Sequence, residues 1–153
     1  MGDAYFYHLT RNPLEATLPL LLGKARAQGW RVAVRGTDPE HMEWLNERLW
    51  LGPEERFLPH GLAGRPHAAR QPVLLTVAPG PPENAAQCLM TVDGAEVQPD
   101  EVTALDRVCV LFEDRDPQSV DRARDQWRTL TRAGCAAQYW SEASGRWEKQ
   151  AEA

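Results

Sequence analysis

Short apolar runs alternate along the chain with longer stretches whose apolar residues recur at helical spacing. Three such runs each end close to an Asx-Pro pair, and a helical pattern follows each pair. Residues 5–9 precede Asn12-Pro13, residues 31–34 precede Asp38-Pro39, and residues 108–112 precede Asp116-Pro117. Because Asn and Asp cap helices and proline suits the first helical position, each pair predicts the start of a helix.

The three predicted helices end where the helical pattern ends. The first runs from Leu14 to Gln28 and stops at Gly29, the second continues through Leu49, and the third spans residues 119–134. Glu15 lies three residues after Asn12, which predicts a capping box. Further strands are expected at 72–77 and 88–92, with loops at 61–66 and 78–82 and an edge strand and tail formed by 137–140 and 145–147.

Strands that alternate with helices are typical of parallel βαβ units. We therefore predict an α/β fold: a single three-layer domain over residues 1–153, with a mostly parallel central sheet flanked by helices. It is Rossmann-like but lacks the nucleotide-binding glycine fingerprint, because the first turn reads Thr10-Arg11-Asn12-Pro13. Residues 141–153 are expected to form a tail that could be flexible.

The third predicted helix carries a candidate binding patch. Its buried stripe contains Ala123 and Trp127, while Arg124 and Arg128 lie just off one edge. Two guanidiniums beside an indole suit a carboxylate that is next to an apolar side chain. The commoner interpretation of such a pattern is a packed indole with solvated charges. Exposed pairs with helix acids such as Asp125 contribute only ~0.3–0.5 kcal/mol, so the carboxylate of an acidic peptide could compete for the arginines.

Composition narrows the classes of partner. The net charge of −5 and the pI near 5.4 argue against direct binding to the phosphate backbone of nucleic acids, so any role with DNA is expected to be indirect. Cys88, Cys109 and Cys135 form no Cys-x-x-Cys pair and are typical of reduced, buried cytosolic thiols. No signal sequence and no membrane-length apolar run is visible. We expect a cytoplasmic protein that does not contact a membrane.

The sequence contains few of the motifs that mark catalytic or metal sites. The four histidines do not have metal-ligand spacing, no Gly-x-Ser-x-Gly elbow occurs, and no cofactor or metal is expected. Glu113, Asp114 and Asp116 follow a predicted strand, where α/β enzymes often carry catalytic acids. These acids could equally cap and stabilise the next helix. We expect no intrinsic catalytic activity, and a small-molecule enzyme that uses these acids stays open as the alternative.

Several segments together resemble the chi subunit of the bacterial DNA polymerase III holoenzyme, part of the clamp-loader assembly. The resemblance covers most of the chain. Its most specific residues are the Phe-x-Pro-His run at 57–60 and the Leu49-Trp50 before it. The other matching segments are 6–9, 29–34, 45–50, 57–64 and the third βα unit with its ending at 132–134.

The resemblance implies a non-catalytic adaptor in DNA replication, within a complex that is a DNA-directed DNA polymerase. Such an adaptor binds the acidic, Phe-terminated C-terminal tail of single-stranded DNA-binding protein and links it to the clamp loader through the psi subunit. Arg128 is the position that would receive the terminal carboxylate, Arg124 is the second cation and Trp127 the neighbouring aromatic. An adaptor to a repair helicase would use the same patch.

Two further aromatic residues belong to this interpretation. The resemblance makes Phe57 the aromatic residue of the peptide pocket, although a Phe beside Leu58 could also be core. Trp50 is expected to be core or a pocket wall, with core favoured.

Overall fold

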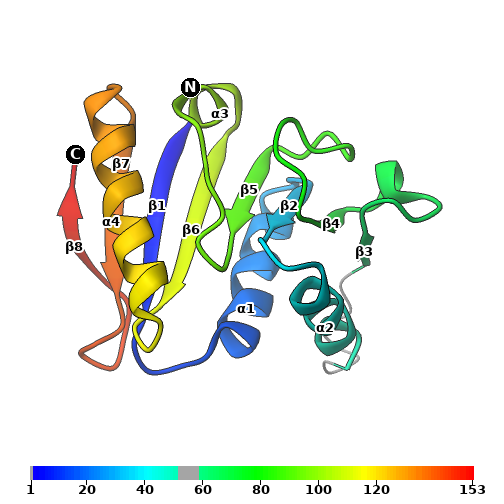
Figure 1. Ribbon diagram of the computed structural model, residues 1–153, viewed down its shortest axis with the longest axis horizontal. Helices are drawn as coiled ribbons and strands as arrows, with labels where there is room; N and C mark the ends of the chain where they lie inside the picture. Colours follow the sequence, from blue (N-terminus) through cyan, green and yellow to red (C-terminus); the bar gives the residue numbers. More distant parts are fainter. Residues whose placement is uncertain (1, 52–58) are drawn as a thin grey trace.

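The computed structural model describes residues 2–51 and 59–153, and within them one mixed sheet dominates (Figure 1). The strands are β1 Asp3–Leu9, β2 Val32–Arg35, β3 His60–Leu62, β4 Val73–Thr76, β5 Cys88–Thr91, β6 Arg107–Glu113, β7 Ala136–Ser141 and β8 Glu148–Glu152. Their order is β3-β4-β2-β5-β6-β1-β7-β8. All neighbouring pairs are parallel except β7 and β8, which are antiparallel. The predicted mostly parallel sheet is confirmed.

Helices cover both faces of this sheet. They are α1 Leu14–Ala27, α2 Pro39–Trp50, α3 Pro99–Ala104 and α4 Pro117–Arg132, and a short 3-10 turn spans Ala68–Arg70. On β2 the alternation of side chains separates the two cores: Val32 and Val34 pack with residues of α1 and α2, whereas Ala33 packs with residues of α3 and α4. The two cores lie on opposite faces, so the predicted three-layer α/β architecture is confirmed.

The predicted helix starts are confirmed, but only one of the predicted caps is made as expected. Asp38 caps α2, because its carboxylate accepts from the backbone N–H of Glu40 at 3.0 Å. The capping box at Asn12 and Glu15 is wrong. Asn12 instead donates its backbone and side-chain N–H groups to Glu142, which follows β7. The Asn12 side chain is therefore engaged by a distant carboxylate, and the N-cap position of α1 is Pro13, without a side-chain cap.

Three elements differ from the sequence-based expectation. The 3-residue strand β3 lies partly inside the predicted loop at 61–66, and the 6-residue helix α3 had no predicted counterpart. Both are too short to produce a clear periodic pattern. Strand β8 lies in the segment expected as a tail, where Lys149 and Ala151 pair with Trp140 and Tyr139 of β7.

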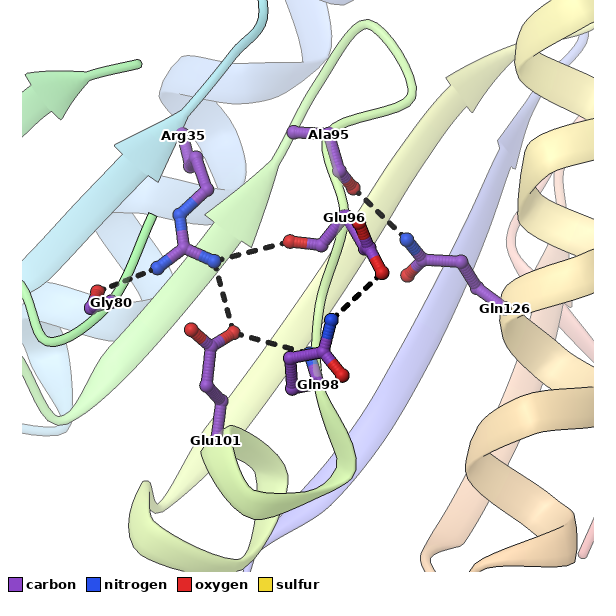
Figure 2. A network of polar contacts seen from close by, with 7 residues as sticks. All are labelled: Arg35, Gly80, Ala95, Glu96, Gln98, Glu101 and Gln126. Atoms are coloured by element: carbon purple, nitrogen blue, oxygen red, sulfur yellow. Dashed lines mark hydrogen bonds and ion pairs between the residues drawn. The ribbon is translucent and has the colours of Figure 1, made fainter. Parts of the chain in front are cut away.

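A polar network joins the end of β2 to α3 and α4 on the face that α3 and α4 cover (Figure 2). The guanidinium of Arg35 is buried, and it donates to the Glu101 carboxylate at 2.9 Å and to the carbonyls of Glu96 and Gly80. Glu101 also accepts from the backbone N–H of Gln98. The network holds the segment between β5 and α3 in place, and this segment is the one that α4 contacts.

Candidate functional site

The rotation of α4 is fixed by different contacts on its two sides. On one side, Trp127 packs edge-on against Phe6 of β1 and Tyr139 of β7, with ring centroids 5.3 and 6.3 Å away. On the other side, the amide of Gln126 donates to the Ala95 carbonyl at 3.2 Å (Figure 2). These contacts leave Trp127 half-buried at the border between core and solvent, as its place in the apolar stripe predicted.

The two arginines that flank Trp127 in the sequence are exposed. Arg128 Nη1 lies 3.3 Å from Asp125 Oδ1, and the two side chains are 62% and 75% exposed. Such an exposed pair is worth little, because solvent screens it and both side chains lose freedom. Arg124 has no ion pair among the described residues. We define Arg124, Trp127 and Arg128 as the α4 patch.

A chain of hydrogen bonds lies beside the α4 patch and was not anticipated from the sequence. The hydroxyl of Tyr139 contacts Nδ1 of His8 at 2.5 Å, and Nε2 of His8 contacts the Asp114 carboxylate at 2.8 Å. The imidazole also stacks on Phe112, with ring centroids 4.8 Å apart. The three side chains come from β1, β7 and the residue that follows β6, so only the strand order brings them together.

The guanidinium of Arg124 and the carboxylate of Asp114 both influence the pKa of Tyr139. Burial raises the pKa of Tyr139, and the negative charge of Asp114 raises it further, while Arg124 acts in the opposite direction. The phenol therefore keeps its proton at neutral pH. Trp127 of the α4 patch packs against the ring of Tyr139, so the hydrogen-bond chain lies next to the patch.

The three acids proposed as alternative catalytic residues each have a partner inside the fold. Glu113 pairs with Arg115 at 2.7 Å, Asp114 with His8 at 2.8 Å, and Asp116 accepts from the Ser119 hydroxyl at 2.8 Å. A cavity of about 280 Å³ lies between residues 9–13 and 113–115, next to two of these acids. It opens at the carboxyl edge of the sheet, where α/β folds commonly bind ligands.

The remaining sequence-based expectations have mixed outcomes. Phe57 lies outside the described residues. Trp50 was expected in the core, but its side chain is 50% exposed, because it is the last residue of α2. Its ring lies against that of His60, with centroids 4.1 Å apart. Cys88 and Cys109 are buried free thiols as predicted, whereas Cys135 is a free thiol that is only half-buried, because it follows the exposed end of α4. The hydrogen bond with Cys88 and burial both raise the pKa of Cys109.

Among residues 2–51 and 59–153, no group of three or more His, Cys, Asp or Glu side chains could hold a metal ion. None of the helices in these residues has the length and hydropathy of a membrane span.

Fold and patch together define the class: a three-layer α/β protein whose last helix presents two exposed arginines and a half-buried tryptophan beside strands β1 and β7. The family model for the DNA polymerase III chi subunit, HolC, matches residues 1–138. The chain belongs to this family.

One curated relative supports the same assignment. The probable DNA polymerase III subunit chi of Rickettsia prowazekii (strain Madrid E) is 29% identical over 86 residues. The aligned part covers 56% of this chain and 52% of the Rickettsia protein, so the match spans about half the length of that relative.

Proposed function

We propose that this protein acts in DNA replication as a non-catalytic adaptor of the DNA polymerase III holoenzyme, and that its α4 patch binds the acidic C-terminal tail of single-stranded DNA-binding protein. A psi subunit would connect it to the clamp loader in the cytoplasm. The observation that supports this role best is the exposure of Arg124 and Arg128 beside Trp127, in a chain of the chi family.

The mechanism is reversible binding in which no covalent bond is made or broken. The fork of Arg128 can hold a terminal carboxylate through two N–H donors, after displacing Asp125, whose exposed pair at 3.3 Å contributes little. The half-buried indole of Trp127 offers a flat apolar surface for the last side chain of the tail. Arg124, one turn earlier, is available for an acid further upstream.

The net charge of −5 makes the position of these arginines important. An acidic tail is repelled by the protein as a whole, so its binding depends on cations concentrated within one helical turn. Interactions between exposed charges are screened over about 8 Å at physiological ionic strength. We therefore expect the affinity for the tail to fall as salt is added.

The test is calorimetry with an acidic peptide that ends in a free phenylalanine carboxylate. Arg128→Glu should weaken binding by about a hundredfold or more, because a carboxylate then faces a carboxylate instead of a guanidinium. The matched control is Arg122→Glu on the other side of α4, where the Arg122 side chain lies against Gly94 and the carbonyl of Asp93. This control should change the affinity by about threefold or less, because its charge lies away from the patch.

Two further measurements complete the test. The same peptide with a C-terminal amide should bind wild type weakly, because the amide lacks the charge that Arg128 is proposed to hold. Equal thermal unfolding of wild type and both variants shows that the fold is kept. Unchanged affinity of Arg128→Glu would reject the assignment of the patch. A pulldown from cell extract with wild type and Arg128→Glu would then distinguish a replication partner from a repair helicase.

The cavity at the carboxyl edge favours one second candidate, a small-molecule enzyme that uses Glu113 and Asp114. A thermal-shift screen with nucleotides and phosphates separates the two functions. A rise in melting temperature with a nucleotide or phosphate, together with an inert Phe-terminated peptide, would support the enzyme and contradict the adaptor.

A further inference from the structure

The hydrogen-bond chain Asp114–His8–Tyr139 adjoins the α4 patch and has no role in the adaptor function as proposed so far. We propose that Tyr139 is a further peptide-contacting residue, oriented by His8 and Asp114, whose hydroxyl donates to a carboxylate of the acidic tail when His8 is protonated. This inference rests on the proposed function, because it concerns the same peptide and the same surface.

The direction of each hydrogen bond follows from the chemistry of the three groups. An ionised Asp114 only accepts, so Nε2 of His8, at 2.8 Å, must carry a hydrogen. In a neutral imidazole the other nitrogen, Nδ1, then carries none and can only accept. The hydroxyl of Tyr139 must therefore donate its single proton to His8, and it presents only lone pairs to any ligand.

Protonation of His8 reverses the second bond. Both imidazole nitrogens of a charged histidine donate, so Nδ1 donates to the oxygen of Tyr139 and the O–H of Tyr139 becomes available to another acceptor. The charge that the proton adds faces the carboxylate of Asp114, 2.8 Å from Nε2. A tail carboxylate therefore finds no donor at Tyr139 when His8 is neutral, and finds the free O–H of Tyr139 when His8 is charged.

The position of Tyr139 makes this donor accessible to a peptide on α4. Tyr139 lies beside Phe6 in the register of β1 and β7, and Trp127 contacts both rings. The Tyr139 side chain is half-buried rather than enclosed. A peptide that reaches from Arg128 past Trp127 towards the carboxyl edge of the sheet would pass this hydroxyl.

Few charged groups surround the hydrogen-bond chain Asp114–His8–Tyr139, so the effect of protonating His8 can be separated from the effects of other groups. Asp114 contacts His8 directly, and Arg124 of α4 acts on Tyr139. Glu113 is held by Arg115, and Glu142 after β7 accepts from residues 11 and 12. Phe112 stacks on the imidazole and carries no charge.

The experiment measures the affinity of the full chain for the acidic, Phe-terminated peptide at about pH 5.5 and about pH 8, the range over which histidines change charge. Wild type should bind about tenfold more tightly at the lower pH, the change expected for one hydrogen bond to a charged group. Tyr139→Phe keeps the ring that contacts Trp127 and should equal wild type at about pH 8. At the lower pH it should bind about tenfold more weakly than wild type.

A second variant and a control make the test independent of the stability of Tyr139→Phe. His8→Gln cannot be charged and should show less than about a twofold change in affinity with pH. His41→Gln breaks a similar histidine–aspartate contact, with Asp93, away from the Tyr139 side of α4, and should keep the pH dependence of wild type. Calorimetry near neutral pH in two buffers should show proton uptake on binding for wild type and none for His8→Gln.

The possible outcomes separate this inference from the proposed function. If wild type does not bind the peptide at either pH, or Arg128→Glu binds it normally, the proposed function fails. If Arg128 is required but Tyr139→Phe and His8→Gln keep the affinity and pH profile of wild type, only the role of Tyr139 is wrong. A Tyr139→Phe variant that is weaker by the same factor at both pH values would also overturn it, because a merely structural role predicts that result.

Discussion

Charged side chains behave differently at the carboxyl edge of the sheet and on α4. At the edge, Glu142 accepts from the backbone N–H groups of Arg11 and Asn12 at 2.9 and 2.8 Å, and Glu113, Asp114 and Asp116 also have internal partners. On α4, Arg124 and Arg128 extend into solvent with at most one weak, exposed partner. The buried carboxylate of Glu142 stabilises the fold, whereas the exposed guanidiniums of Arg124 and Arg128 are available to another molecule.

Trp127 is where the two regions meet. Its ring contacts Phe6 and Tyr139, and through Tyr139 it is linked to His8 and Asp114 at the edge. The half-buried indole also reaches solvent, beside the exposed Arg124 and Arg128. We therefore expect substitutions at the edge to change stability alone and substitutions of the arginines to change mainly binding. A substitution of Trp127 should change both.

The largest effect is expected for Trp127→Ala, which should reduce both properties. Loss of a half-buried indole should lower the free energy of unfolding by about 2–3 kcal/mol, somewhat less than full burial would cost. Binding of the Phe-terminated peptide should fall as well, because the flat apolar surface is removed. Urea unfolding and calorimetry measure the two effects. A stable variant that binds normally would break the link between packing and recognition.

Glu142→Gln should affect stability without affecting binding. The carboxylate accepts three hydrogen bonds from residues 11 and 12, and replacing it should cost about 1–3 kcal/mol at neutral pH. Burial alone would raise the pKa of Glu142, but the hydrogen bonds from Asn12 and Arg11 outweigh it and lower the pKa below its ordinary value of 4.5.

The sign of that shift fixes the pH dependence. The stabilisation by Glu142 is present above pH 4.5 and is lost as the pH falls through the lowered pKa of the folded state. The difference in unfolding free energy between wild type and Glu142→Gln should therefore narrow in acid. Urea unfolding at a series of pH values checks this. A difference that widens as the pH falls would show that the hydrogen bonds do not favour the charged form.

The smallest effect on the fold is expected for Arg124→Ala. The side chain is exposed and has no ion pair among the described residues, so the unfolding free energy should change by less than about 0.5 kcal/mol. Affinity for the acidic peptide should fall by about three- to tenfold, the contribution of one exposed charge to a charged ligand. Chemical unfolding and calorimetry together test it. A large loss of stability with unchanged affinity would place Arg124 with the edge residues.

Local sequence was sufficient for most of the fold. Asx-Pro pairs gave the starts of three helices, and the apolar stripe of α4 correctly placed Trp127 at the border of core and solvent. The capping box at Asn12 failed because the competing acceptor, Glu142, lies 130 residues away in the chain. A long-range hydrogen bond of this kind leaves no signal in the sequence near the start of the helix.

For the candidate site, the sequence by itself determined α4: its amphipathic spacing places two arginines at one edge of a buried stripe, whatever the helix packs against. Only the tertiary structure decided what lies beside that edge. Strand β1 pairs with both β6 and β7, and this order brings His8, Asp114 and Tyr139 together although 106 residues separate the first two and 131 separate His8 from Tyr139. Helical spacing is a property of neighbouring residues, whereas strand order depends on how the whole chain buries its two cores.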